Sequence, residues 1–390
     1  MNSVESFNVF MPTRILFGAG RASEVGAEAA LCGKRATIVT YKDVRGMEET
    51  IEKITGYLKE AGLSVTIYPE VEPDPSVDTI NRGAEMVRGE KSEVMIGLGG
   101  GSAIDAAKAI AVVAVNGGDA WDYVVCNPDR REFNSSLPIV AVPTTSGTGS
   151  EVTPVSVITN KIMKSKGAIV SPVNIPGVAI IDPEVTKTMP PGLTASTGLD
   201  AFGHALEAFI SSKATPFVAC MSPEAVKLIW DNLPIAYEDG GNVLARANMA
   251  WASTLAGILL VQSGAIGNHS LAQALGAHLH IPHGLGVAIG TPYFLEYCRS
   301  EASEKYIQIA RKLGIGEGMD SEDAIIDEFI RQIKIFLKKF DIPEDLKDRS
   351  HEIDRDALVE NAIFNAPAAL ANTPREVTHA DMAEIIAQII

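Results

Sequence analysis

The chain has 390 residues, of which 46% are hydrophobic and 21% are charged, and this composition excludes a disordered or fibrous protein. Acidic residues outnumber basic ones by 49 to 33, and the net charge of −16 disfavours binding to nucleic acid or to an anionic membrane surface. The four cysteines are scattered, no signal peptide is visible, and the apolar stretches look shorter than a membrane span, so we expect a cytoplasmic protein.

Strand-like and helix-like segments alternate over the first half of the chain. Apolar, β-rich runs predict the strands, and apolar residues at helical spacing predict the helices between them. Alternation of this kind predicts a parallel sheet with helices on both faces, and strands without polar alternation fit a sheet that is buried on both sides. The predicted strands are 36–40, 64–68, 93–98 and 138–142, and the predicted helices are 47–61, 77–87 and 103–115.

The pattern changes where prolines cluster, at Pro183, Pro190 and Pro191. Beyond this point strand signals almost vanish, and several helical segments are apolar on nearly all sides, as in the centre of a bundle. We therefore predict an α/β domain over residues 1–187 and an all-α domain over residues 188–390. The predicted helices of the second half are 201–211, 223–232, 245–260, 270–278, 303–313, 323–340 and 356–362.

A glycine-rich turn, Gly99-Gly100-Gly101-Ser102, follows the predicted strand at 93–98 and precedes a predicted helix. Glycines let a ligand approach the backbone closely, and the N–H groups at the start of a helix attract an anion. The turn is neither a GxGxxG fingerprint nor a P-loop, and a single glycine often serves only the geometry of a turn. Three glycines and a serine favour a pyrophosphate site.

A second loop of small residues, 143–151 (PTTSGTGSE), follows the next predicted strand. Its hydroxyls and backbone amides suit a phosphate or a nicotinamide amide, and the alternative is a plain Ser/Thr-rich turn. Two such loops after neighbouring parallel strands would share the sheet edge at which open α/β sheets bind ligands. This coincidence favours the ligand site.

Five of the seven histidines fall between residues 200 and 283. Asp200 and His204 are four residues apart in a helical pattern, so their side chains share one face. His269 begins another predicted helix, and His283 lies in a Pro-His-Gly turn. One carboxylate and three imidazoles favour a divalent transition metal, whereas each residue taken alone fits a surface or core position equally well.

With these motifs in view, the chain resembles the iron-dependent (group III) alcohol dehydrogenases over nearly its whole length. The resemblance implies an N-terminal dinucleotide-binding domain of Rossmann type, an all-helical C-terminal domain and an active site in the cleft between them. The matching segments are FGAG at 17–20, GGGSAIDAAKAIA at 99–111, PTTSGTGSEVT at 143–153, TGLDAFGHALEAF at 197–209, the stretch 269–284 and NTPREVTHADM at 372–382.

The resemblance also implies roles for individual residues. Metal ligation is expected from Asp200, His204, His269 and His283, with Fe²⁺ as the metal and Zn²⁺ as the alternative. Contacts to NAD(P)(H) are expected from Gly99, Gly100, Gly101, Ser102, Asp105, Thr144, Thr145, Thr148 and Lys166. The chain departs from the pattern at Gln273, where many members carry a second histidine, and at Tyr41, where many NAD-using members carry an aspartate.

The implied reaction is reversible hydride transfer between NAD(P)H and a small aldehyde or ketone, with the metal polarising the carbonyl oxygen. The substrate pocket is expected to include Leu259, Leu260, Gln262 and Gln273, which suggest a small and partly apolar substrate. A homodimer or a higher homo-oligomer is expected as the assembly.

Three alternatives share the fold or the motifs. A lyase like dehydroquinate synthase would need a basic pocket, and Lys and Arg are sparse around the expected metal residues. Glycerol dehydrogenase is nearer, but its metal set lacks one of these histidines. An inactive relative would serve only as a metal- or nucleotide-binding module, although all four ligand positions and both loops are intact.

Tyr41 bears on the choice of cofactor. An acidic residue near the end of the second strand binds the adenosine ribose and repels a 2′-phosphate. Tyr41 removes that repulsion, its ring is suited to stack on adenine, and Lys42 or Arg45 would attract the phosphate, so NADP(H) should be tolerated. In the alternative, Tyr41 only packs on the surface and Asp43 takes the role of the acidic residue.

Overall fold

The computed structural model describes residues 6–43, 46–163, 165–352, 354–364 and 366–390. The chain forms two compact units. The sheet unit comprises Met11–Pro190 and Gly240–Thr254, and the helical unit comprises Pro191–Asp239, Leu255–Ile390 and the segment up to Phe10. The segment up to Phe10 thus groups with the helical unit and Gly240–Thr254 with the sheet unit, although each is far in the sequence from most of the unit that it joins. That 1–187 and 188–390 are separate domains stays a prediction.

The sheet unit is built on six strands that are all parallel, in the order β1-β8-β5-β4-β2-β3. Every residue of β4 and β5 is buried, as expected for central strands that helices cover on both faces. The strands are β1 (Arg14–Phe17), β2 (Arg35–Tyr41), β3 (Ser64–Val71), β4 (Val94–Gly99), β5 (Ile139–Pro143) and β8 (Val178–Ile181).

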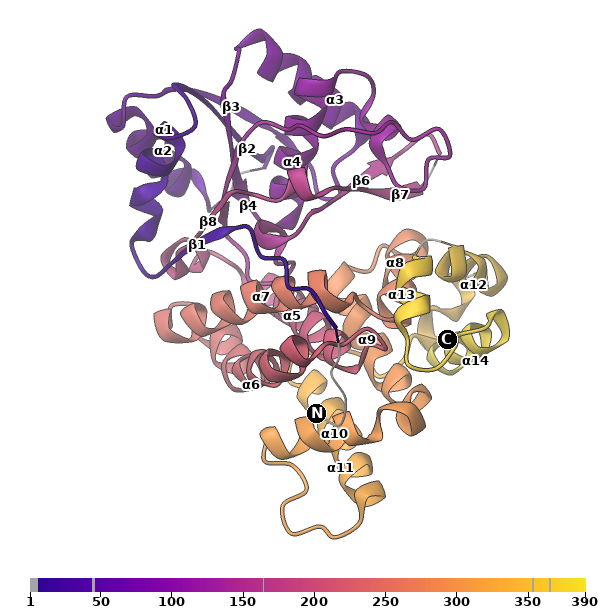
Figure 1. Ribbon diagram of the computed structural model, residues 1–390. Helices are drawn as coiled ribbons and strands as arrows, with labels where there is room; N and C mark the ends of the chain where they lie inside the picture. The colour runs from indigo at the N-terminus through magenta and orange to yellow at the C-terminus, as the bar shows by residue number, and fades with distance from the viewer. Residues whose placement is uncertain (1–5, 44–45, 164, 353, 365) are drawn as a thin grey trace. The chain divides into compact units, whose positions relative to one another are not determined.

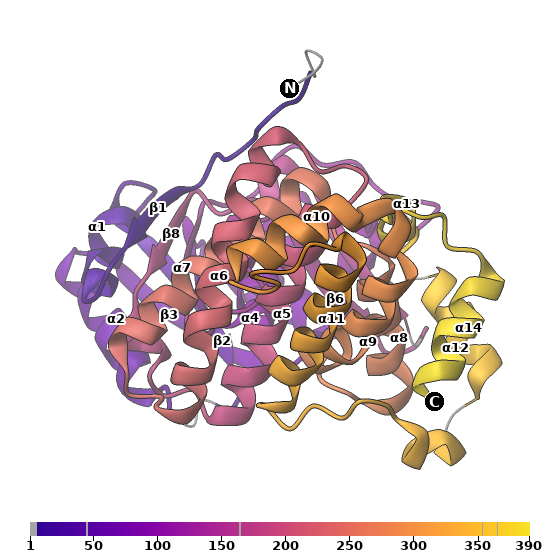
Figure 2. The same cartoon turned by 90° about the horizontal axis from the view of Figure 1, so that it is seen from below.

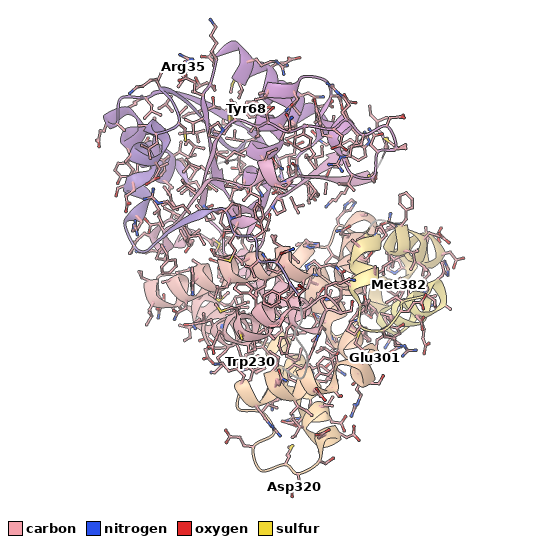
Figure 3. The ribbon with its side chains drawn as sticks, in the orientation of Figure 1. Arg35, Tyr68, Trp230, Glu301, Asp320 and Met382 are labelled. Carbon is pink, nitrogen blue, oxygen red and sulfur yellow. The ribbon has the colours of Figure 1, made fainter. Side chains whose placement is uncertain are left out.

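Helices cover the two faces of this sheet (Figure 1). Helices α1 (Val25–Ala30) and α2 (Glu48–Glu60) pack on one face, and α3 (Val77–Gly89) and α4 (Gly101–Asn116) pack on the other. Side chains alternate between the faces, so Ile96 joins the core under α1 and α2 while its neighbour Met95 joins the core under α3 and α4. On the second face the buried Tyr68 hydroxyl donates to the Thr79 carbonyl at 2.7 Å (Figure 3).

The predicted fold class is confirmed, with a parallel sheet followed by helices. The four predicted strands and three predicted helices of the first half are present, with ends that differ by a few residues. The pattern did not predict β1 and β8, which have four residues each, nor the antiparallel hairpin of β6 (Val155–Asn160) and β7 (Ser165–Val170). Short strands contain too few residues for a periodic pattern.

The helical unit contains no strand among its described residues. Helix α9 lies beside α8 and α11 (Figure 2), and in another part of the unit Trp230 stacks on Phe336 at 4.4 Å between ring centroids (Figure 3). Its helices are α5 (Pro191–Ile210), α6 (Pro216–Glu238), part of α7 (Val243–Ser263), α8 (Gly267–Leu279), α9 (His283–Tyr297), α10 (Arg299–Lys312), α11 (Glu322–Lys338), α12 (Arg355–Phe364), α13 (Pro367–Asn372) and α14 (His379–Ile389).

Helix α9 was missed by the sequence analysis, as were α13 and α14. Ten of its 15 residues are buried, so it lacks the polar face that produces a 3.6-residue pattern. It also contains Pro292 and three glycines, which read as turn signals.

Helix α7 corrects the expectation that no apolar segment is long enough to span a membrane. Val243–Ser263 has 21 residues and a mean hydropathy of 1.3, and it passes that test by length and composition alone. Yet 67% of its apolar window is buried inside the protein, as in the core helix of a folded unit.

Candidate metal centre and dinucleotide loops

The four predicted metal residues come together in the helical unit. Helix α5 carries Asp200 and His204 on one face, α8 carries His269 in its first turn, and α9 begins at His283. Asp200 Oδ1 lies 3.7 Å from His204 Nε2, 3.8 Å from His269 Nε2 and 3.7 Å from His283 Nε2. The His204 and His269 rings stack with centroids 4.7 Å apart. Three helices therefore bring three imidazole nitrogens within 3.8 Å of one carboxylate oxygen.

Glycines allow the helices to approach closely enough for this convergence. A Cβ atom at Gly203 would lie 2.3 Å from Val287 Cγ1, and one at Gly284 would lie 1.9 Å from the Ser196 carbonyl oxygen. Both distances are far below van der Waals contact. The start of α9, and with it His283, can reach Asp200 only because these two positions have no side chain.

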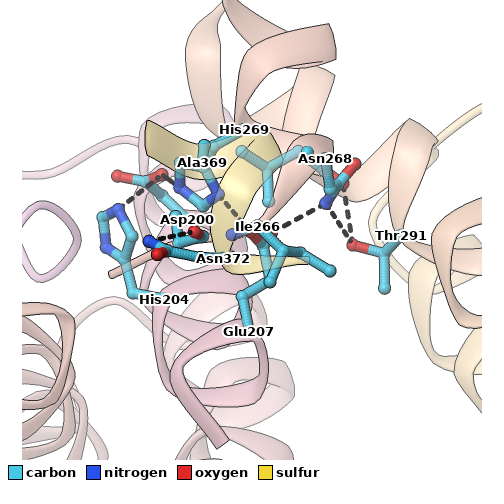
Figure 4. A network of polar contacts seen from close by, with 12 residues as sticks. Asp200, His204, Glu207, Ile266, Asn268, His269, Thr291, Ala369 and Asn372 are labelled. Carbon is cyan, nitrogen blue, oxygen red and sulfur yellow. Dashed lines mark hydrogen bonds and ion pairs between the residues drawn. The ribbon is translucent and has the colours of Figure 1, made fainter. Parts of the chain in front are cut away.

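A second carboxylate, Glu207, orients one of the imidazoles (Figure 4). Its Oε2 lies 2.8 Å from His269 Nδ1 and accepts the Ile266 N–H at 2.9 Å, and its Oε1 accepts from Asn268 Nδ2 at 2.8 Å. With Nδ1–H bonded to Glu207, the His269 lone pair is on Nε2, which faces Asp200. Sequence reasoning missed Glu207, although it lies three residues after His204 and seven after Asp200 on the same helix.

The C-terminal motif holds the start of α8. Thr373 Oγ1 accepts the Gly267 N–H at 3.0 Å, and Asn372 Nδ2 donates to the Ala265 carbonyl at 3.2 Å. Figure 4 shows Asn372 close to the polar network. These bonds fix the turn that leads into α8, and so fix the position of His269.

The chemistry of the donor set fits a divalent transition metal. Asp200 Oδ1 and His269 Nε2 are buried and have no hydrogen-bond partner among the described residues, a costly arrangement unless a ligand binds there. Ligand atoms about 2.1 Å from a tetrahedral metal lie about 3.4 Å apart, close to the 3.7–3.8 Å separations from Asp200. The atoms of Asp200, His269 and His283 all lie within 4.8 Å of one another.

The charges of the set support each other. Burial raises the pKa of Asp200, but the three neighbouring imidazoles outweigh burial and leave the pKa below its ordinary value. Burial lowers the pKa of His269, whereas Glu207 and then Asp200 raise it, and its pKa ends above the ordinary value. The low pKa keeps Asp200 ionised, as cation binding requires, whereas His269 must lose its Nε2 proton before that nitrogen can bind a metal.

In the sheet unit, the glycine turn lies at the switch point of the topology. From β2 the chain continues outward to β3, and from β4 it continues in the opposite direction to β5. Open α/β sheets bind ligands at the carboxyl ends of the two strands where the direction reverses. Tyr41 ends β2 and Gly99 ends β4, so the turn occupies this position.

The two predicted loops are in contact. Thr144 N–H donates to the Gly99 carbonyl at 2.9 Å. A Cβ at Gly100 would lie 2.9 Å from Thr145 Oγ1, and one at Gly101 would lie 2.6 Å from Thr148 Cγ2. No side chain caps α4, and its first turn has no acidic residue. A hydroxyl-lined cradle at an uncapped helix N-terminus fits a pyrophosphate.

Three other residues predicted to bind the cofactor, Tyr41, Lys166 and Ser102, each contact a neighbouring residue of the sheet unit. The Tyr41 hydroxyl accepts the Gly100 N–H at 3.1 Å, and burial raises the pKa of Tyr41 to about 12, so its ring packs against the glycine turn in the neutral form. Lys166 pairs with Asp74 at 2.8 Å, and the Asp74 N–H donates to Ser102 Oγ at 3.3 Å. The structure thus gathers Lys166 and Ser102 around Asp74.

The structure also shows contacts for two other residues to which the sequence analysis gave a role, Asp105 and Lys42. The Asp105 carboxylate accepts hydrogen bonds from the protein itself, from Ser150 Oγ and from the Val157 N–H. Lys42 lies 4.0 Å from Glu70, and Arg45 falls outside the described residues.

The four residues predicted to line the substrate pocket differ in burial and in their contacts. Leu259 is buried, and Leu260 and Gln273 are partly buried. Gln262 exchanges two hydrogen bonds with the Phe10 backbone, at 3.3 and 3.1 Å. Gln262 therefore anchors the N-terminal segment in the helical unit, which sequence reasoning did not foresee.

Family models match both halves of the chain. The model described as iron-containing alcohol dehydrogenase matches residues 12–183, and the C-terminal model of the same family matches residues 194–390. The chain belongs to the iron-containing alcohol dehydrogenase family. Its dinucleotide loops and its four metal-donor residues fall within the two matched regions.

Individual relatives agree with this family assignment. The chain is 34% identical over 383 residues to the NAD-dependent methanol dehydrogenase of Bacillus methanolicus, covering 97% of this chain and 98% of that protein. It is 34% identical over 380 residues to the NADPH-dependent butanol dehydrogenase of Clostridium saccharobutylicum, covering 96% of each. Among solved structures, sulfoacetaldehyde reductase from Bifidobacterium kashiwanohense in complex with NAD⁺ aligns with a TM-score of 0.86 and 31% identity, covering 99% of each chain.

Proposed function

We propose that this chain is a metal-dependent alcohol dehydrogenase that transfers a hydride between NAD(P)H and a small aldehyde or ketone. The observation that carries the proposal is the set of three imidazole nitrogens within 3.8 Å of Asp200 Oδ1. Two buried atoms of the set, Asp200 Oδ1 and His269 Nε2, have no hydrogen-bond partner among the described residues, and a divalent cation would satisfy both. We propose Fe²⁺ as this cation, with Zn²⁺ as the alternative that the same donor set accepts.

The relatives support the same chemistry. One is named for methanol and NAD, another for butanol and NADPH, and a structural neighbour holds NAD⁺. Their alcohols and aldehydes differ, so we propose only the class of substrate, a small alcohol and its carbonyl product. We further propose that the enzyme is cytoplasmic and acts as a homodimer or a higher homo-oligomer.

The residues have distinct tasks in this proposal. Asp200, His204, His269 and His283 would hold the metal, which supplies Lewis-acid polarisation of the carbonyl oxygen when bound. Glu207 keeps the His269 Nδ1 protonated and its Nε2 free to donate its lone pair. Burial of Asp200 and His269 shields these two donors from water, whereas His283 is exposed.

The loops of the sheet unit would bind the dinucleotide, which supplies the hydride. The backbone N–H groups at the start of α4 would bind the pyrophosphate, and the hydroxyls of Thr145 and Thr148 line the same cradle. Gln273 has a side-chain amide that does not titrate near neutral pH. It can therefore hydrogen-bond a ligand but cannot act as a general acid or base.

The lyase alternative has less support. It requires cationic side chains for a phosphorylated, carboxylated substrate, and no Lys or Arg lies in α5, α8 or α9, the three helices that carry the metal donors. The matching family model and the two relatives described above are alcohol dehydrogenases.

The test is spectroscopic. Metal-loaded protein, prepared anaerobically, is mixed with NADH or NADPH and a panel of short aldehydes, and absorbance at the nicotinamide band is followed. The proposal predicts aldehyde-dependent loss of this absorbance. Binding of NADH without turnover of any aldehyde would favour the inactive module instead.

A further inference from the structure

We propose that Lys108 and Asp105 form a buried latch that locks the hydroxyl loop, residues 143–153, against the glycine turn and so preforms the dinucleotide site. The inference rests on the proposed function, because it assigns these residues as positioning residues for cofactor binding. It changes the expectation for Asp105, which the family resemblance had implied as a direct cofactor contact.

Lys108 lies beneath the hydroxyl loop and is fully buried. Its Nζ donates to Ser150 Oγ at 2.7 Å, to Thr153 Oγ1 at 3.2 Å and to the Val155 carbonyl at 2.8 Å. An ammonium group has three N–H donors, and all three are used within one short segment. A single side chain of α4 thus holds the far end of the loop.

Asp105 lies one turn earlier on the same helix and binds the same segment. Its Oδ1 accepts from Ser150 Oγ and lies 3.7 Å from Lys108 Nζ, and its Oδ2 accepts the Val157 N–H at 2.9 Å. Ser150 is therefore bonded to both charged residues. The carboxylate and the ammonium together fix the loop and the strand that follows it.

The loop is held at its start by the last residue of β4 and further along by α4. At its start, Thr144 N–H bonds to Gly99 of the glycine turn, and Thr148 packs on Gly101, the first residue of α4. At its end, the latch joins the loop to α4 two turns further along. Because a helix is stiff over this distance, fixing both ends sets the spacing between the two walls of the cradle.

We infer that the buried pair of Lys108 and Asp105 serves to position the loop and not to stabilise the fold. Burial lowers the pKa of Lys108 to about 8 and raises the pKa values of Asp105 and Glu151. Glu151, also buried, accepts from Thr254 Oγ1 at 2.8 Å. Apolar residues of similar volume often stabilise a core at least as well as a buried ion pair. The benefit of keeping these charges is a single, well-defined loop conformation.

The decisive variants are Lys108→Met, which removes the three Lys108 hydrogen bonds of the latch, and Ser150→Ala, which removes the contact shared by Lys108 and Asp105 without removing a charge. Ser156→Ala is the matched control, since its hydroxyl donates to the Asp105 backbone carbonyl at 2.6 Å and bonds β6, not residues 143–153, to α4. All three are compared with the unmodified full chain. Circular dichroism and metal content establish that each variant is folded and that its metal site is intact.

Two readouts test the latch. Hydrogen exchange of the loop amides 144–153 is measured without cofactor, and NADH affinity is measured by fluorescence titration. We expect exchange to accelerate and the NADH Kd to rise about tenfold or more in Lys108→Met, as for the loss of a charge-assisted hydrogen bond. Ser150→Ala should show both effects to a smaller extent, and Ser156→Ala should stay within about twofold.

Unchanged exchange and an unchanged Kd in Lys108→Met would overturn the latch. If Lys108→Met does not fold, Ser150→Ala is the deciding variant. Loop exchange and an NADH Kd in Ser150→Ala that equal those of the unmodified protein would then overturn the proposal. If the unmodified protein binds neither NADH nor NADPH, the proposed function fails, and the exchange data still determine whether Lys108 orders the loop.

Discussion

Replacing Glu207 with glutamine should weaken metal binding without removing any metal ligand. The carboxylate accepts three hydrogen bonds, from His269, Ile266 and Asn268, whereas a glutamine amide has one acceptor oxygen. Whichever way the amide turns, its NH₂ group faces a donor. We expect the orientation of His269 to weaken, because a neutral amide oxygen is a poorer acceptor for its Nδ1–H than a carboxylate, and the other amide orientation leaves that N–H facing an NH₂ group.

The magnitude follows from the position of Glu207 behind a metal-binding histidine. Loss of such a partner typically costs 10- to 100-fold in metal affinity, about 1.4–2.7 kcal/mol. The buried donor left without an acceptor should destabilise the protein by about 1–3 kcal/mol in addition. The control is Thr291→Val, which removes a bond to Asn268 at 3.2 Å in the same network but none to His269.

The assay is competition with a chromogenic chelator for Co²⁺ or Zn²⁺, which are stable in air, at one fixed pH for all variants because metal binding displaces protons from the ligands. Glu207→Gln should raise the metal Kd by at least tenfold. Thr291→Val should lower the melting temperature and leave the metal Kd unchanged. Equal metal affinities for Glu207→Gln and the unmodified protein would refute the role of this carboxylate.

Four further predictions concern other parts of the molecule. Gly284→Ala should destabilise the helical unit by about 1–3 kcal/mol and reduce its metal content, because the new methyl group would lie 1.9 Å from a carbonyl oxygen of α5; a fully metal-loaded variant with an unchanged melting temperature would contradict the packing argument. Tyr41→Asp should weaken NADPH binding about tenfold relative to NADH, since a carboxylate repels the 2′-phosphate, and an enzyme that already ignores NADPH would show this reasoning to be wrong. Gln273→Ala should change KM more than the pH dependence of kcat, and loss of an ionisation from the rate profile would contradict the assignment. Glu72→Gln should cost about 2 kcal/mol at pH 7, because burial raises the pKa of this carboxyl but hydrogen bonds from the start of α3 hold it at about 2. A lowered pKa in the folded protein stabilises it at pH values above the unfolded pKa near 4.5, and this stabilisation is lost as the pH falls toward 2. The denaturation curves of Glu72→Gln and the unmodified protein should therefore converge in acid. A full difference in stability that persists at pH 2 would contradict the assignment.

The four residues predicted as metal donors lie together in the structure, whereas the residues that support them were not predicted. Asp200 and His204 are recognisable from their spacing of four in a helix, and the family motif adds His269 and His283. The contact between Glu207 and His269 joins residues 62 positions apart, and no local pattern encodes such a pair. The same holds for the glycines that bring α9 onto α5.

The sheet unit shows a similar limit. Strands of five or more apolar residues, such as β4 and β5, were predictable from composition alone. The motif that contains Asp105 suggested a ligand contact, but the structure shows the carboxylate bonded to Ser150 and Val157. A motif indicates that a residue is near a site, and only the tertiary structure shows whether its side chain faces the ligand or supports the loop.

The most direct test of the metal centre is removal and return of the metal. The protein is exhaustively chelated, checked for residual metal, and assayed for aldehyde-dependent oxidation of NAD(P)H before and after anaerobic addition of Fe²⁺, with His283→Ala treated in parallel. The account predicts no turnover in the metal-free protein, recovery on adding Fe²⁺, and no recovery in His283→Ala. Full activity in the metal-free protein would contradict the account.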